Sequence, residues 1–295
     1  MSNDPSRSGS PRNQPLLLWM GLLAMLAAAV GGLGAAPALA ASVPDVRSES
    51  ALIVRGDTGQ VLYSKNADQV VPIASITKLM TAMVVLDAKQ PLDETIQITD
   101  AEVDRLRGSS SRLPVGTRLT RRQALLLALM SSENRAAAAL LRTYPGGKRA
   151  GVVAMNRKAR DLGMTHSRFV EGTGLSGDNR ATPADLVRLV EGASRYPLIR
   201  ENSTREKFTL LVGRYPTEYR NTNPLVRKAD WDIALTKTGY LSEAGRCLVM
   251  KTTVSGKPVV MVLMNSWGTL TRVADAARVR RWIEAGQASQ VATAR

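Results

Sequence analysis

The sequence has very few of the side chains that most often form metal sites and hydrolytic dyads. Its 295 residues include one His and one Cys. A single Cys cannot form an internal disulfide, and one His with one Cys argues against a zinc site, which needs clustered ligands. His166, the only base for a Ser-His-Asp triad, lies in a turn-like segment that favours a structural or surface role. The sequence therefore predicts neither a metal nor another cofactor.

Aromatic and acidic residues are also scarce. Phe, Trp and Tyr make up 4% of the chain, and 25 Asp and Glu face 40 Lys and Arg, which gives a formal net charge of +15. Nucleic acid would be the default partner of so basic a chain. However, no nucleic-acid motif is present, and the basic residues are spread along the sequence. We therefore predict no nucleic-acid partner and instead peripheral association with an anionic wall or membrane surface.

The first 40 residues have the pattern of an export signal. A polar, basic lead precedes an uncharged apolar run at residues 16–30, and residues 38–40 have the small-residue spacing of a cleavage site. We predict a signal peptide at 1–40, export to the periplasm, and a single domain at 41–295 with no additional C-terminal domain. The alternative is an uncleaved anchor, because residues 16–40 are long enough to span a bilayer.

The rest of the chain has strand patterns at its two ends and helical patterns between them. Residues 51–64 predict a β-hairpin, and residues 233–265 predict three strands linked by tight turns. Between them, Thr120 and Gln123 form a capping box before an apolar helix that ends near Ser131. The expected fold class is α+β, an antiparallel β-sheet with flanking helices and an inserted all-helical lobe.

The first candidate motif is Ser75-Ile76-Thr77-Lys78, at the start of an apolar helical pattern. Positions i and i+3 share one helix face, so the hydroxyl and the amine can touch. Free backbone N–H groups in the first helical turn favour a developing anion there. Ser75 with Lys78 can therefore be an activated nucleophile. The alternative is a capping serine followed by a surface lysine.

Two further motifs follow in a fixed order. Ser132-Glu133-Asn134 lies where the buried helix breaks, and Lys237-Thr238-Gly239 lies at the end of a predicted strand. The order Ser-x-x-Lys, Ser-x-Asn, Lys-Thr-Gly is typical of β-lactamases and penicillin-binding proteins. Each motif alone is weak, but the three in order at element boundaries point to acyl transfer.

The residue types suit that chemistry. With no histidine base, Lys78 must act as a neutral amine, which needs desolvation or a nearby like charge such as Lys237. Ser132 can relay protons and Asn134 can hold the substrate amide. Lys237 and Thr238 can bind a carboxylate, while Gly239 lets a substrate strand lie close to the sheet edge.

These segments resemble the penicillin-recognising serine transferases, and among them the low-molecular-mass penicillin-binding proteins of the D-alanyl-D-alanine carboxypeptidase family. The similarity spans about residues 51–284 and includes 74–82, 169–176, 220–225, 237–240 and 244–250. It is greatest to the D-alanyl-D-alanine endopeptidase subgroup.

The resemblance implies a β-lactamase/transpeptidase-like fold and a role for each motif residue. Ser75 would form the acyl-enzyme, Lys78 would accept the proton, and Ser132 and Asn134 would complete the site. Lys237 would contact the substrate carboxylate, and the backbone N–H groups of Ser75 and Tyr240 would form the oxyanion hole. The implied partners are peptidoglycan stem peptides and cross-links, with β-lactams as covalent inhibitors.

The sequence departs from related enzymes in two places. Only residues 285–295 follow the last predicted helix, so the C-terminal β-domain of many such carboxypeptidases is not expected. The Glu-x-x-Leu-Asn segment that class A β-lactamases use for deacylation is not found, although Glu171 lies near such a place. We expect slow release of bound penicillin, and Cys247 is expected to be a buried small side chain.

Four functions remain from the sequence alone. The first is an endopeptidase that cleaves D-alanyl-D-amino-acid cross-links, and the alternative is a D-alanyl-D-alanine carboxypeptidase. A penicillin-sensing module and a β-lactamase are less favoured.

Overall fold

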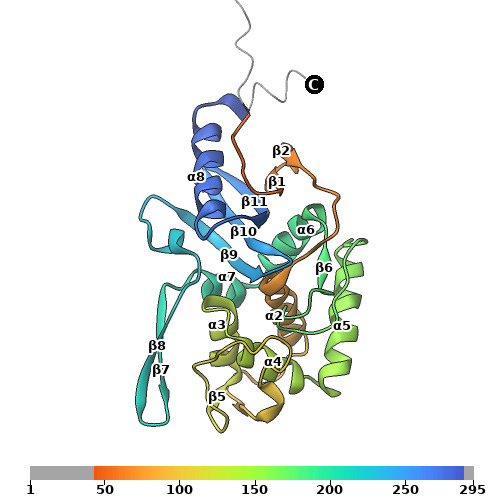
Figure 1. Cartoon of the computed structure of the whole chain (residues 1–295), viewed down its shortest axis with the longest axis vertical. Coiled ribbons are helices and arrows are strands. Elements are labelled where there is room, and N and C mark those ends of the chain that lie inside the picture. Colours follow the sequence, from red (N-terminus) through yellow and green to blue (C-terminus); the bar gives the residue numbers. More distant parts are fainter. Residues whose placement is uncertain (1–42, 289–295) are drawn as a thin grey trace, which may run out of the picture. The chain divides into compact units, whose positions relative to one another are not determined.

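A five-stranded antiparallel sheet, in the order β2-β1-β11-β10-β9, runs through the computed structural model of this protein (Figure 1). The model describes residues 43–288, so the predicted signal peptide lies outside the described residues. The strands are β1 (Ser50–Arg55), β2 (Val61–Lys65), β9 (Asp232–Leu241), β10 (Gly245–Val254) and β11 (Lys257–Ser266). The predicted hairpin and the predicted three-strand meander are confirmed, and they join at the β1–β11 pair.

Both faces of the sheet are covered, which explains why its strands are apolar almost throughout. On β11, Met261 and Leu263 pack in a cluster with Val279 of helix α8 (Thr271–Glu284). The alternate residues Val260 and Val262 belong to the larger cluster that includes the helical lobe. Because successive side chains of a strand point to opposite faces, one continuous apolar run supplies two cores.

The helical lobe is inserted between β2 and β9. Its helices are α2 (Thr77–Asp87), α3 (Arg121–Met130), α4 (Asn134–Arg142), α5 (Gly147–Asp161), α6 (Pro183–Ala193) and α7 (Pro197–Thr204). Short strands pair in this region as β3 (Val71–Pro72) with β6 (Arg180–Ala181), β4 (Thr95–Gln97) with β5 (Arg118–Thr120), and β7 (Lys207–Val212) with β8 (Tyr215–Arg220). The predicted capping box is present, with Thr120 Oγ1 accepting from Gln123 N. The α+β class with an inserted helical lobe is confirmed.

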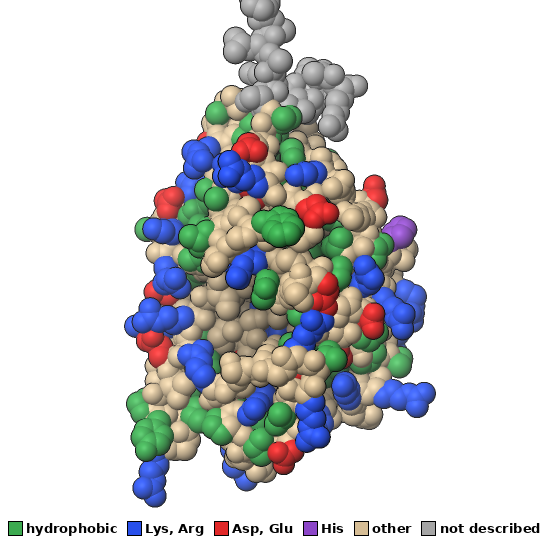
Figure 2. Space-filling model, in the orientation of Figure 1, with side chains coloured by type: hydrophobic (Ala, Val, Ile, Leu, Met, Phe, Trp, Pro, Cys, Tyr) green, Lys and Arg blue, Asp and Glu red, His purple; other side chains and the backbone are tan. Residues whose placement is uncertain are grey.

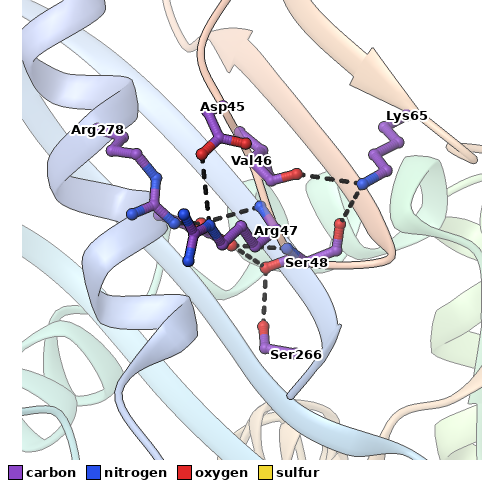
Figure 3. Close-up of polar contacts among 8 residues, drawn as sticks. Asp45, Val46, Arg47, Ser48, Lys65, Ser266 and Arg278 are labelled. Atoms are coloured by element: carbon purple, nitrogen blue, oxygen red, sulfur yellow. Dashed lines mark hydrogen bonds and ion pairs between the residues drawn. The ribbon is translucent and has the colours of Figure 1, made fainter. Parts of the chain in front are cut away.

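A buried carboxylate fastens the first described residues to the sheet and to α8. Asp275 accepts hydrogen bonds from Ser48 N at 2.7 Å and from Ser48 Oγ at 2.6 Å. Ser48 Oγ also lies 2.7 Å from Ser266 Oγ, and Lys65 Nζ donates to the carbonyls of Val46 and Ser48 (Figure 3). These bonds compensate the burial of the carboxylate and fix where the chain enters β1.

Within residues 43–288, no helix combines the length and the apolar composition needed to cross a bilayer.

Candidate active site

Ser75 lies in a 3₁₀ turn, η1 (Ala74–Ile76), that leads directly into α2. Ala74 has a left-handed φ of 47°, and Gly174 packs against it so closely that a Cβ on Gly174 would lie 2.0 Å from Ala74 O. Only glycine fits that contact, which fixes the loop at residue 174 against the turn that carries Ser75. The sequence placed Ser75 in the first helical turn, and the structure places it in the 3₁₀ turn just ahead of that helix.

Lys78 is fully buried and donates three hydrogen bonds. Its Nζ lies 2.7 Å from Ser75 Oγ, 2.8 Å from Asn134 Oδ1 and 2.6 Å from Thr173 O. These three acceptors match the three donors of an ammonium group and hold the nitrogen beside the serine. The i, i+3 contact predicted from the sequence is therefore present.

Burial lowers the pKa of Lys78 from its usual 10.5 to about 8, while the charges of Glu171 and Glu133 act in the opposite direction. The cause is mainly desolvation, which the sequence argument named as one option. Repulsion between like charges instead acts on Lys237. Burial lowers the pKa of Lys237 well below its usual value, and the charges of Lys78 and Arg272 lower this pKa further.

Ser132 stands at the break between α3 and α4 with a φ of 60°. A serine in the left-handed region carries a conformational cost, and such positions often belong to functional sites. Lys237 Nζ donates to Ser132 Oγ at 2.8 Å and to Thr238 O at 2.8 Å. The predicted Ser-x-Asn and Lys-Thr-Gly motifs therefore meet through a direct contact across 105 residues.

Strand β9 lies directly against the turn of Ser75. A Cβ on Gly239 would lie 3.0 Å from Ala74 Cβ and 3.1 Å from Ser75 N. Beside it, Thr238 is buried and donates to Thr222 Oγ1 at 2.6 Å, whereas Tyr240 is 57% exposed. Gly239 thus allows the close approach that brings the Lys-Thr-Gly strand to the serine.

Several contributors were not expected from the sequence. Thr173 supplies a backbone carbonyl to Lys78, and Ser109 Oγ accepts from Asn134 Nδ2 at 3.1 Å. Arg272, at the start of α8, is 8% exposed, has an unpartnered buried Nε and acts on the charge of Lys237. A backbone carbonyl leaves no sequence signal, and one Arg in a chain rich in Arg gives none either.

Glu171 organises the loop that supplies Thr173. Its carboxylate accepts hydrogen bonds from Thr173 N and Gly174 N, both at 2.6 Å, and from Asn179 Nδ2 at 2.7 Å. The two oxygens are therefore engaged in holding the loop in shape. This agrees with the sequence observation that Glu171 is not part of a β-lactamase deacylation motif.

The remaining polar candidates lie where the sequence placed them. His166 is exposed, and Cys247 is a buried free thiol whose pKa burial raises to about 11. Among residues 43–288, no group of three or more His, Cys, Asp and Glu side chains is arranged to hold a metal ion.

The geometry defines a site for acyl transfer. A half-buried serine hydroxyl contacts an amine whose pKa is lowered to about 8, close to neutral pH. This is the arrangement of an activated nucleophile. Beside it lies a second buried amine, that of Lys237, whose hydrogen bonds go to a hydroxyl and a carbonyl rather than to a carboxylate. An anionic group of a substrate would favour the charged form of this amine, so the position is suited to bind one.

Known proteins share both this fold and this sequence. The family model described as D-alanyl-D-alanine carboxypeptidase matches residues 38–268. The solved Streptomyces K15 DD-transpeptidase superposes with a TM-score of 0.76 at 28% identity, over 82% of this chain and 98% of that one. The chain therefore belongs to the D-alanyl-D-alanine carboxypeptidase family of serine peptidases, as the resemblance implied.

Within that family, the chain is similar to proteins of one kind in particular. It is 52% identical over 252 residues to a D-alanyl-D-alanine endopeptidase of Pseudomonas aeruginosa, covering 85% of this chain and 81% of that protein. It is 49% identical over 261 residues to the D-alanyl-D-alanine endopeptidase of Escherichia coli, covering 88% and 84%.

Proposed function

We propose that this protein is a serine peptidase that hydrolyses D-alanyl-D-amino-acid bonds of peptidoglycan, and that it acts mainly as an endopeptidase on cross-links. The observation that carries the proposal is the 2.7 Å contact between Lys78 Nζ and Ser75 Oγ, made by a buried amine with a pKa of about 8. Near that pH, a substantial share of Lys78 is a free base in contact with the hydroxyl.

In the proposed acylation step, Lys78 removes the proton of Ser75 and the oxygen attacks the carbonyl carbon of the scissile amide. The backbone N–H groups of Ser75 and Tyr240 would stabilise the resulting oxyanion, and Gly239, which precedes Tyr240, packs against Ser75 N. The leaving amine takes its proton through Ser132, the C–N bond breaks, and an ester on Ser75 remains. Water then cleaves that ester and restores the hydroxyl.

A cationic group on the sheet side binds the carboxylate of the leaving residue. Lys237 is 1% exposed, Thr238 is 5% exposed, and Arg272 carries an unpartnered Nε. An anion entering here would replace repulsion between like charges with attraction, which favours a substrate whose carboxylate stands next to the scissile amide. On the side of the helical lobe, Asn134 at the start of α4 holds the substrate amide.

Both candidate substrates carry that carboxylate, so the site residues alone do not choose between them. In a pentapeptide the leaving group is D-alanine, and in a cross-link it is the D-centre of a diaminopimelate with its own carboxylate. The relatives at 52% and 49% identity are endopeptidases, while carboxypeptidases of Streptomyces and Escherichia coli are 31% and 28% identical. This difference in identity favours cleavage of cross-links.

Digestion of purified muropeptides, followed by chromatography, tests the choice. Cross-linked dimers should fall to monomers faster than pentapeptide monomers lose D-alanine. If pentapeptides lose D-alanine while dimers persist, the protein is a carboxypeptidase and the endopeptidase hypothesis is wrong. Absence of either cleavage by folded enzyme would contradict the proposed function itself.

β-Lactams should acylate Ser75 and leave slowly. The chain is similar, at 26% identity and a TM-score of 0.71, to a Listeria penicillin-binding protein solved in its cefotaxime-bound form, over 82% of this chain and 98% of that one. Glu171 is held in its own loop and is not free to activate a hydrolytic water on the ester. A fluorescent penicillin should label the enzyme durably. Rapid loss of the label would favour a β-lactamase, and label without peptide cleavage would favour a sensor.

We further propose that the protein works outside the cytoplasm, in the periplasm, after residues 1–40 direct its export. The formal charge of +15 and the excess of Lys and Arg over Asp and Glu on the face in Figure 2 suit association with an anionic wall. Salt-dependent binding to isolated cell wall, lost at high ionic strength, is the expected observation.

A further inference from the structure

An ion pair joins three segments next to the candidate active site. Arg107 binds Glu243 with two nitrogens, Nη1 to Oε2 at 3.0 Å and Nη2 to Oε1. Its Nε donates to Leu175 O at 2.9 Å, and Gly177 lies against the Glu243 carboxylate. The pair thus connects the loop before β5, the loop held by Glu171, and the turn between β9 and β10.

Arg107 stands on a pre-ordered loop that is tied to the site. Asp104 accepts hydrogen bonds from the backbone N–H groups of Leu106, Arg107 and Ser109 at 2.9–3.0 Å. Ser109 in turn accepts from Asn134, which contacts Lys78. The guanidinium also has a partner other than Glu243, because its Nε donates to Leu175 O.

The pair lies where the acyl side of the substrate leaves the cleft, if the proposed function holds. Lys237 and Thr238 bind the carboxylate of the leaving residue, and the scissile bond lies beside Gly239. The acyl side must then run along β9 past Tyr240 toward Glu243. A strand advances about 3.4 Å per residue, so the second acyl-side residue lies roughly 7 Å beyond the scissile carbonyl, within side-chain reach of Glu243.

We propose that Arg107 and Glu243 form a subsite for a side chain that ends in an amino-acid group, with an ammonium and a carboxylate on one carbon. The inference rests on the proposed function and names the substrate class. Arg107 would bind the carboxylate with the two nitrogens that now hold Glu243, and Glu243 would bind the ammonium.

The charges explain why the ligand needs both signs. A side chain with one charge must break the Arg107–Glu243 pair and leave one member without a partner, so it gains little. A group with both charges replaces the pair with two new pairs, so neither Arg107 nor Glu243 is left without a partner. The two side chains are 30% and 37% exposed, so they are accessible to such a group. Arg107 also lowers the pKa of Glu243 to about 2, which keeps the carboxylate charged at any working pH.

The test compares singly cross-linked dimers that differ only in the third residue of the stem peptide on the acyl side: meso-diaminopimelate, its side-chain carboxamide, and L-lysine. The wild-type enzyme should cleave the diaminopimelate peptide with a kcat/KM about tenfold above the other two, the gain expected of one partly exposed charge-assisted pair. In Arg107→Gln this ratio should fall toward one because the diaminopimelate value falls. Glu243→Gln should lower the same value.

The matched control is Arg55→Gln. Arg55 also binds a carboxylate with two nitrogens, at 3.0 and 2.7 Å from Asp57, but it lies at the β1–β2 hairpin on the side of the sheet away from β9. This variant should keep the wild-type ratio. An equal rate for all three peptides in the wild type, or an unchanged ratio in Arg107→Gln, overturns the subsite. Failure of the wild type to cleave any of the three would instead contradict the proposed function.

Discussion

The site has a helical wall, which carries Lys78 on α2, and a sheet wall, which carries Lys237 on β9. Each wall buries its lysine, and the surroundings of the two amines differ. On the helical wall, Lys78 contacts a hydroxyl, an amide oxygen and a carbonyl, with two carboxylates close enough to raise its pKa. On the sheet wall, Lys237 contacts a hydroxyl and a carbonyl, and the charges that act on it are cations. The pKa of Lys78 therefore lies near 8, whereas Lys237 has no carboxylate among its hydrogen-bond partners.

On the basis of this difference we propose different tasks for the two lysines. An amine with a pKa of about 8 can take and return a proton during a reaction near neutral pH. A buried amine without a carboxylate partner is stabilised in its charged form when an anionic ligand arrives, which would favour binding of a substrate carboxylate. We therefore expect variants of the helical wall to affect the chemical step and variants of the sheet wall to affect binding.

The largest expected effect is that of Ser75→Ala. Removing the hydroxyl should lower peptide hydrolysis by at least about a thousandfold and abolish covalent penicillin labelling, because the oxygen that forms the proposed ester is gone. The control is Ser64→Ala, which changes an exposed serine on β2 within another Ser-x-Asn sequence. Labelling that survives in Ser75→Ala would place the nucleophile elsewhere.

Lys78→Arg should slow acylation by about a hundredfold or more, since a guanidinium does not give up its proton. The buried position also makes this variant prone to misfolding, so the pH profile of the wild type provides a second measurement. Because the pKa of Lys78 is lowered to about 8, the free base is abundant above that pH and falls about tenfold per unit below it. Acylation should follow the same curve. A rate that is flat between pH 6 and 9 would contradict the base assignment.

The sequence predicted the helical wall more completely than the sheet wall. Ser75 and Lys78 are three residues apart, so local helix geometry alone brings them together. The meeting of Ser132 with Lys237 joins residues 105 positions apart, and only the order of the motifs suggested it. Thr173 contributes a backbone carbonyl, and Arg272 gains its role from burial beside Lys237, so neither could be found from residue types or spacing.

The same reasoning applies to the fold. Periodicity and tight turns predicted the β9–β11 meander and the helix that Thr120 caps, because both are local patterns. In residues 200–230, α7 extends to Thr204, and β7 and β8 form a hairpin of two six-residue strands. The tertiary packing of α7 against β9, which buries Ile199, stabilises a helix that its own sequence indicates only weakly.

On the sheet wall, Lys237→Gln should weaken substrate binding more than it slows the chemical step. We expect kcat/KM for a peptide with a free terminal carboxylate to fall about a hundredfold, the usual cost of removing one member of a buried charge pair. The same peptide with a terminal carboxamide lacks the anion and should be affected far less. Equal losses for the two peptides would show that Lys237 acts in the chemistry rather than in binding.

The smallest expected effect comes from a substitution that displaces β9 relative to the turn of Ser75 and leaves both lysines unchanged. In Gly239→Ala, the added Cβ would lie 3.0 Å from Ala74 Cβ, 3.1 Å from Ser75 N and 3.2 Å from Ile73 O, so β9 must shift by a few tenths of an ångström. We expect acylation to slow about tenfold, since small misplacements of reacting groups are costly.

Gly239→Ala also separates the two walls experimentally. The three acceptors that Lys78 Nζ contacts belong to η1, α4 and the loop at Thr173, and none of them belongs to β9. The midpoint of its pH–rate profile should therefore stay near 8 in the variant while the plateau rate falls. A midpoint that moves toward 10 would mean that β9 is what keeps water from Lys78, and the helical wall would then not set the pKa of the base by itself.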